Sequence, residues 1–264
     1  MIGPTPLLDF FKRGEVTRDV RMEAAQGTLT PRAYEQLAIL ILLLEDPDAE
    51  IRSTAEETIS HIPADILKTF LARSDLPVDM REFFADRGIF PDEIPQIELQ
   101  EEEPLLETAP ADAAAVLGDE NEDRETATQR LAKMSFSERL KAAVKGSREM
   151  RSILIRDPNK MIASSVLSSP KLAEPEVEAF AKMANVSEDV LRIIASNRAW
   201  MKNYGILHSL TKNPKTPLGM SLNLMSRLND RDLAQLSVDR NVPEPLRIAA
   251  RKKVVAKQSG KERD

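Results

Sequence analysis

Apolar residues in the first third of the chain recur at the spacing of amphipathic helices. Ile51, Ala55 and Ile59 lie at i, i+4 and i+8, so they form one stripe along a helix. Residues 37–44 (LAILILLL) are apolar on every side of a helix, which predicts the buried central helix of this part of the chain. Two further short helices are expected within residues 64–74 and 78–88.

The starts of these helices have recognisable signals. Thr30 is a capping residue followed by Pro31, and proline is favoured at the first helical position. Asp46 and Pro47 repeat the combination before the helix that carries Ile51. We therefore expect Thr30 and Asp46 to cap these two helices.

A repeat of 28 residues organises the last part of the chain. Four good N-cap residues mark it: Asp157, Asn185, Asn213 and Asn241. Two apolar columns are in register with them: Ile162, Val190, Leu218 and Leu246, then Val166, Ile194, Leu222 and Ala250. Each unit is expected to hold two short helices. Because one pair cannot bury its apolar stripe alone, the pairs are predicted to stack into an α-solenoid.

Two stretches resemble known α-helical repeats. The segment DPDAEIRSTAEETI, residues 46–59, is similar to the second helix of HEAT and armadillo-type repeats, with its Asp-Pro, its acid-hydrophobe-Arg step and its alanines. The 28-residue units are similar to HEAT-like and variant leucine-rich α-repeats. The resemblance implies a curved all-helical array that works as a binding surface.

The expected fold class is all-α, with four segments. Aromatic residues make up only 4% of the chain, and a core of Leu, Ile, Ala, Val and Met favours helices. The domains are a HEAT-like helical bundle at 1–95, an acidic disordered linker at 96–130, a basic repeat domain at 131–257 and a disordered tail at 258–264.

Charge divides along the same boundaries. Residues 1–95 carry 10 basic and 18 acidic groups, for a net charge of −8. Residues 96–130 carry 2 and 11, for −9, and residues 131–264 carry 25 and 14, for +11. The formal charge of −6 for the whole chain therefore hides a strongly basic C-terminal part.

The sequence lacks the usual signatures of catalysis. The chain has no cysteine, which excludes disulfides, thiolate nucleophiles and zinc–thiolate sites. His61 and His208 are not in a metal-binding spacing, and neither a phosphate-binding glycine loop nor GxSxG is present. We expect no cofactor, no metal and no catalytic residue. Lacking a signal peptide and an apolar run long enough to cross a bilayer, the chain is expected in the cytoplasm without membrane insertion.

Two clusters are candidates for a binding surface. Trp200, Tyr204 and His208 are spaced at i, i+4 and i+8, and three lysines are near them in sequence: Lys202, Lys212 and Lys215. They form either an aromatic and basic patch that stacks on a partner or the core-facing stripe of a repeat helix. The second cluster is Arg247, Arg251, Lys252 and Lys253. It either contacts phosphate or an acidic protein, or belongs to a solubilising terminal helix.

Three functions are compatible with these patterns. The first is a non-enzymatic protein that binds protein partners through its repeat surface. The second is nucleic-acid binding by the basic repeat domain, with the acidic linker as a competitor in cis. The third is an enzyme on a helical-repeat scaffold, which would need a pocket near Trp200, Tyr204 and His208 with converging carboxylates.

Overall fold

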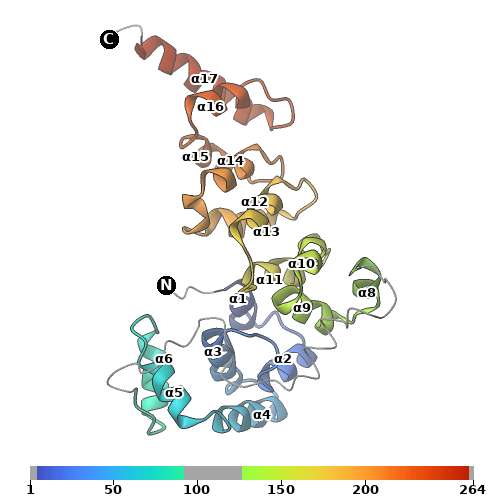
Figure 1. The fold of residues 1–264 in the computed structure, drawn as a ribbon, viewed down its shortest axis with the longest axis vertical. Coiled ribbons are helices and arrows are strands. Elements are labelled where there is room, and N and C mark those ends of the chain that lie inside the picture. Colours follow the sequence, from blue (N-terminus) through green and yellow to red (C-terminus); the bar gives the residue numbers. More distant parts are fainter. Residues whose placement is uncertain (1–4, 92–126, 262–264) are drawn as a thin grey trace. The chain divides into compact units, whose positions relative to one another are not determined.

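The computed structural model describes residues 5–91 and 127–261 and divides the chain into two compact units. Unit 1 comprises Met1–Arg151 and Ser165–Lys171, and unit 2 comprises Ser152–Ser164 and Leu172–Asp264 (Figure 1). All regular structure in the described part is α-helix or 3₁₀-helix, without strands, so the predicted all-α class is confirmed there. No helix in this part is both long and apolar enough to cross a bilayer.

The boundary between the units differs from the one expected. Residues 127–151 group with unit 1, whereas the sequence analysis placed residues from 131 onward in the repeat domain. Most of the predicted linker, up to residue 126, lies outside the described residues. Its last four residues begin helix α8 (Ala127–Lys133), whose Leu131 is buried. Helix α8 therefore begins within the stretch that was predicted to be linker.

Unit 1 is built around the apolar helix that its sequence predicts. Helix α3 (Ala33–Leu43) contacts three helices: α1 (Pro6–Lys12), α2 (Arg18–Ala25) and α4 (Ala49–Ser60). Leu37 and Leu40 are fully buried, which confirms the central helix, and the stripe of α4 is buried at Ile51, Ala55 and Ile59. The other helices wholly within unit 1 are α5 (Ala64–Leu71), α6 (Val78–Ala85), α8, α9 (Phe136–Lys145) and η1 (Val166–Ser168).

Two helices of unit 1, α3 and α4, begin later than predicted. Helix α3 follows the N-cap residue Arg32, and helix α4 follows Asp48. The two predicted cap residues, Thr30 and Asp46, lie two positions before the observed N-caps. The Thr30 hydroxyl accepts a hydrogen bond of 3.3 Å from the Arg32 N–H, and the Asp46 carboxylate accepts one of 2.9 Å from the Asp48 N–H. Both predicted caps are therefore turn residues that lead into the true cap.

Unit 2 is a series of short helices that follow one another along the chain. Helices α10 (Arg148–Leu154) and α11 (Lys160–Ser165) straddle the unit boundary. They are followed by α12 (Glu174–Lys182), α13 (Glu188–Ser196), η2 (Trp200–Lys202), α14 (Tyr204–Lys212), α15 (Leu218–Met225), α16 (Asp230–Leu236) and α17 (Glu244–Lys261). Helix α14 contacts α12 and α15, and α17 contacts α15 and α16.

The repeat columns are buried in three of their four copies. Ile162, Val190 and Leu246 are each fully buried, whereas Leu218 is 38% exposed. In the second column Val166, Ile194 and Ala250 are also fully buried, whereas Leu222 is only partly buried. Helix α15 begins five residues after its column asparagine instead of three, because Pro217 is its N-cap. Its buried face is thereby rotated onto Ser221, Leu224 and Met225, and the prediction is wrong for this copy.

The four column residues were also expected to be N-caps, and none of them is. The N-cap of α13 is Ser187, two residues after Asn185. At the start of α11, Asn159, which lies two residues after Asp157, accepts hydrogen bonds from the N–H groups of Met161 and Ile162. The column residue instead forms the preceding turn, since the Asp157 carboxylate accepts a 2.8 Å hydrogen bond from the Asn159 N–H.

Candidate binding surface of unit 2

The predicted aromatic stripe does not lie on one helix. Trp200 belongs to the 3₁₀ turn η2, and Asn203 then has an extended backbone (φ −78°, ψ 116°). Asn203 is the N-cap of α14, and its side chain accepts hydrogen bonds from the N–H groups of Gly205 and Ile206. The i, i+4, i+8 prediction is therefore wrong at Trp200, because a strong capping residue starts a new helix between Trp200 and Tyr204.

Tyr204 joins helices α14 and α16. Its hydroxyl donates a hydrogen bond of 2.5 Å to Asp232 Oδ2 and accepts one of 3.2 Å from the Asn229 N–H. The hydrogen bond from Tyr204 lowers the pKa of the Asp232 carboxyl. Desolvation, followed by the same hydrogen bond, raises the pKa of the Tyr204 phenol. Tyr204 is still 41% exposed, so its ring is at the surface and not in the core.

His208 lies one turn after Tyr204 and faces the same carboxylate. The two rings are stacked, with 6.3 Å between centroids and 19° between planes. His208 Nε2 is 4.0 Å from Asp232 Oδ1, which is an ion-pair distance only when the imidazole is protonated. Tyr204 and His208 therefore share one carboxylate at the junction of α14 and α16.

The three lysines of the first cluster differ in their surroundings. Lys212 Nζ lies 3.4 Å from Asp239 Oδ2, so its charge is paired. Lys202 and Lys215 are exposed, and within the described part of the chain neither has a carboxylate within ion-pair distance. Only these two lysines leave their charge available at the surface.

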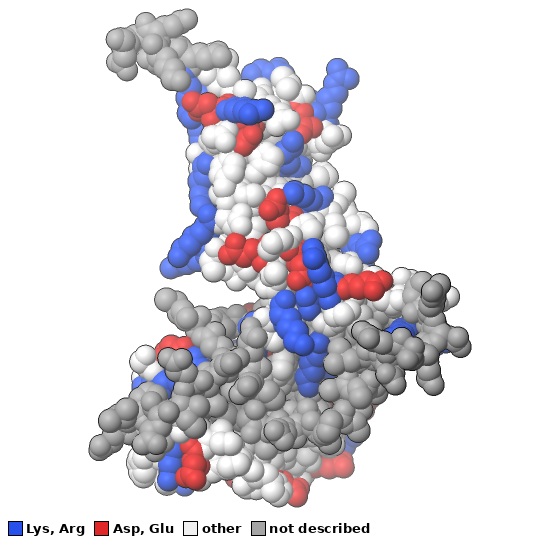
Figure 2. All heavy atoms as spheres, in the orientation of Figure 1, with Lys and Arg blue, Asp and Glu red and all other residues white. Residues whose placement is uncertain are grey.

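The second cluster lies on the last helix. Arg247 is 3.9 Å from Glu244, and an Arg251 guanidinium N–H donates a 3.4 Å hydrogen bond to the Ser237 carbonyl. Lys252 is exposed and Lys253 partly exposed. The next basic residue, Lys257, is paired with Asp230 of α16. Figure 2 shows Lys and Arg along one edge of unit 2, and elsewhere on this face Lys and Arg lie beside Asp and Glu.

The structure brings each cluster into contact with α16 and does not join the two into one site. Tyr204 and His208 meet Asp232, and Arg251 of the second cluster donates to the carbonyl of Ser237, the C-cap residue of α16. Lys257, further along α17, pairs with Asp230. Sequence reasoning missed these acidic partners. The repeat length was a usable signal for one of them, because Tyr204 and Asp232 are 28 positions apart.

Several polar links in unit 2 join residues about one repeat apart. Asn203 donates a hydrogen bond to Glu174, 29 positions earlier, and Lys160 pairs with Asp189, also 29 away. The Asn213 amide donates hydrogen bonds of 2.8 and 3.0 Å to the Ala181 and Met183 carbonyls, at separations of 32 and 30. Much of the polar surface of unit 2 is thus used to tie successive helix pairs together.

In the described part of the chain, no three His, Cys, Asp or Glu side chains come together in a group that could hold a metal ion. Asp232 is the carboxylate that lies beside Tyr204 and His208, and its Oδ2 already accepts a hydrogen bond from the Tyr204 hydroxyl. No protein-family model, no curated protein and no solved structure matches the chain.

Proposed function

We propose that this chain is a helical-repeat protein whose unit 2 binds another protein. The observation that carries the proposal is the contact pattern of unit 2. Helix α12 contacts α14, and α15 contacts α17, so helices that lie about one 28-residue period apart meet at two places in unit 2. Contacts of this kind support a stack of helix pairs, and such stacks offer an extended preformed surface that loses little entropy on binding.

The proposed stack has its own test, the deletion of one whole repeat. Removing residues 185–212, one 28-residue period, takes out α13 and α14 and joins α12 to α15. In a stack, each pair depends only on its neighbours, so the shortened chain should remain helical and unfold cooperatively. Deleting 14 residues, 199–212, is the matched control that destroys the register. Circular dichroism melts that show equal loss of structure in both variants would overturn the stack.

Binding itself is tested by affinity capture from the native cell extract, with and without nuclease treatment. The full chain should be the bait, because residues 131–151 belong to unit 1 and a fragment starting at 131 would divide that unit. Protein partners that persist after nuclease support the proposal. Recovery that disappears with nuclease would replace it by nucleic-acid binding.

Nucleic-acid binding is a second candidate, favoured by the cations that lack carboxylate partners. Lys202, Lys215, Lys252 and Lys253 have no ion pair within the described residues, and residues 131–264 carry a net charge of +11. Such a surface would bind phosphates with a steep dependence on salt. We rank it second because Lys212, Arg247 and Lys257 are already paired with carboxylates.

An enzymatic role is the third expectation and has less support. It would use Tyr204, His208 and Asp232, and the Tyr204 hydroxyl and Asp232 are already engaged in a contact between helices. A cytoplasmic location and the HEAT-like nature of the repeats are likewise proposals, supported by the absence of cysteine and by the paired helices.

A further inference from the structure

Helix α17 has two apolar faces, and only one of them is covered by the rest of unit 2. On the inner face Leu246 and Ala250 are fully buried, where α17 packs against α15 and α16. On the outer face Ile248 is 46% exposed and Val255 is 57% exposed. In a stack of helix pairs, the outer face is the side on which a neighbouring pair would pack.

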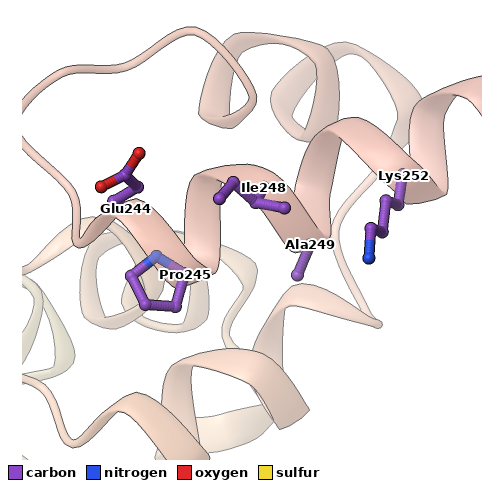
Figure 3. A pocket seen from close by; sticks show the side chains of 5 residues that line it. All are labelled: Glu244, Pro245, Ile248, Ala249 and Lys252. Carbon is purple, nitrogen blue, oxygen red and sulfur yellow. The ribbon is translucent and has the colours of Figure 1, made fainter.

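Three exposed apolar residues and one lysine form a stripe along the outer face, beside a shallow groove. Pro245, Ile248, Lys252 and Val255 follow one another at intervals of three, four and three residues, which places them on one side of the helix. Glu244, Pro245, Ile248, Ala249 and Lys252 line the groove, and Figure 3 shows these side chains in a row along α17. This spacing of anchors is the one by which a helix docks against the apolar face of another helix.

The charge beside the stripe is positive. Helix α17 carries six basic residues and one acidic residue, Glu244. Arg247 and Lys257 have carboxylate neighbours, whereas Arg251, Lys252 and Lys253 have none within the described residues. Arg251 and Lys252 are both exposed and flank Ile248 and Val255. A partner that covers the stripe is therefore favoured if it places carboxylates next to these two cations.

We propose that the outer face of α17 binds an acidic amphipathic helix of a partner protein. Its apolar side chains would cover Pro245, Ile248 and Val255, and its Asp or Glu residues would pair with Arg251 and Lys252. The inference rests on the proposed function and adds the surface and the class of partner. A second copy of α17 fits less well, since its own Arg251 and Lys252 would be brought beside those of the first.

A designed peptide tests the site directly. The probe is a fluorescent 21-residue helix with Leu at heptad a and d positions, Glu at e and g, and Ala elsewhere, titrated into the full chain by anisotropy. We expect saturable binding that weakens at least tenfold in Ile248→Glu. Val78→Glu is the matched control, because Val78 is 60% exposed on α6 of unit 1 and should leave affinity unchanged.

Charge reversal supplies the second arm. Arg251→Glu combined with Lys252→Glu should weaken the Glu peptide tenfold or more and should create binding of a peptide with Lys at e and g. Circular dichroism confirms that each variant is folded. No binding of the Glu peptide, equal binding of a scrambled peptide, or indifference to Ile248→Glu would overturn the proposal. So would tighter binding of a 20-nucleotide RNA that is lost in the charge-reversed variant and unaffected by Ile248→Glu.

Failure of this site is distinguishable from failure of the proposed function. Affinity capture is repeated with the Ile248→Glu chain as bait. If partners are still recovered after nuclease treatment, unit 2 binds protein through another surface and only the α17 site is wrong. If neither bait recovers a protein, the proposed function itself is wrong.

Discussion

The Tyr204 hydroxyl donates a 2.5 Å hydrogen bond to Asp232, a residue 28 positions later and therefore one repeat away. The pair connects α14 and α16, which occupy corresponding positions in two successive 28-residue periods. Together with the hydrogen bonds of Asn213 and Asn203, it shows that helices of unit 2 about 28 to 32 positions apart are joined by polar contacts.

Removing either partner of this hydrogen bond should destabilise the chain modestly. Tyr204→Phe and Asp232→Asn are each expected to lower the free energy of unfolding by about 1 kcal/mol, because the pair is near the surface. The double variant should cost less than the sum of the two single ones, as expected for residues that interact. Urea unfolding of the four proteins measures this coupling. Strict additivity would show that the hydrogen bond contributes nothing.

Two leucines of the same repeat column should lose very different amounts of stability on truncation. Leu246 is fully buried, so Leu246→Ala is expected to cost about 2–5 kcal/mol through lost burial and a residual cavity. Leu218 is 38% exposed, and Leu218→Ala should cost about 1 kcal/mol or less. Chemical denaturation compares them. Equal losses would mean that Leu218 packs as the sequence column predicts and that α15 does not have the rotated face.

Asn213 should be the most sensitive of the column asparagines. Its amide donates to the Ala181 and Met183 carbonyls, its Oδ1 accepts from the Lys215 N–H at 2.9 Å, and it is 4% exposed. Asn213→Ala would leave these groups unsatisfied and should cost about 2–4 kcal/mol. Asn241→Ala is the matched control, since Asn241 is exposed. A thermal melt in which both variants lose equal stability would refute this role.

The buried carboxyl of unit 1 should make stability depend on pH. Glu35 is fully buried, where desolvation raises the pKa of its carboxyl although the Thr30 and Thr5 hydroxyls donate to it. A raised pKa in the folded state means that the folded chain holds this proton more strongly than the unfolded chain. This contribution to stability is complete below the ordinary glutamate pKa and is lost as pH rises through the raised value.

Glu35→Gln should therefore remove this loss of stability. The free energy of unfolding of the variant should change less with pH above about pH 4.5, which is the ordinary pKa of a glutamate. Glu57→Gln on α4 is the control, because Glu57 is exposed and should leave the profile unchanged. Free energies of unfolding measured at half-unit steps between pH 4 and 8 decide the point. Parallel profiles for the wild-type and Glu35→Gln chains would refute it.

Helix existence was predictable from the sequence, and helix starts were misplaced in a regular way. The chain repeats the order Asp-Pro followed by Asp or Asn, at Asp46 and again at Asp157. In both cases the first acidic residue accepts from the N–H two residues later, and the helix begins after that residue. Each of these stretches contains two residues that could cap the helix, two positions apart. The spacing of the apolar residues alone does not show which of the two is the N-cap.

The candidate site was less predictable than the fold. The sequence singled out Tyr204, His208 and Lys212, and the structure places all three beside acidic residues that the sequence analysis did not name. Those contacts depend on the order in which helix pairs pack, which apolar columns indicate only approximately. The exposure of Ile248 and Val255 could not be predicted from the sequence either. Helix α17 carries apolar residues on two faces, and the sequence does not show which face the neighbouring helices cover.

The two units differ in the distances along the chain that their contacts span. In unit 1 the Leu7 N–H donates to the Ser168 hydroxyl, 161 residues away, and Arg32 donates to the Ser169 carbonyl, 137 away. The interhelical hydrogen bonds of Asn213 in unit 2 span at most 32 residues. During synthesis, unit 1 cannot close until residue 169 has left the ribosome. Helix pairs of unit 2 can form as soon as they emerge, because their loops are short.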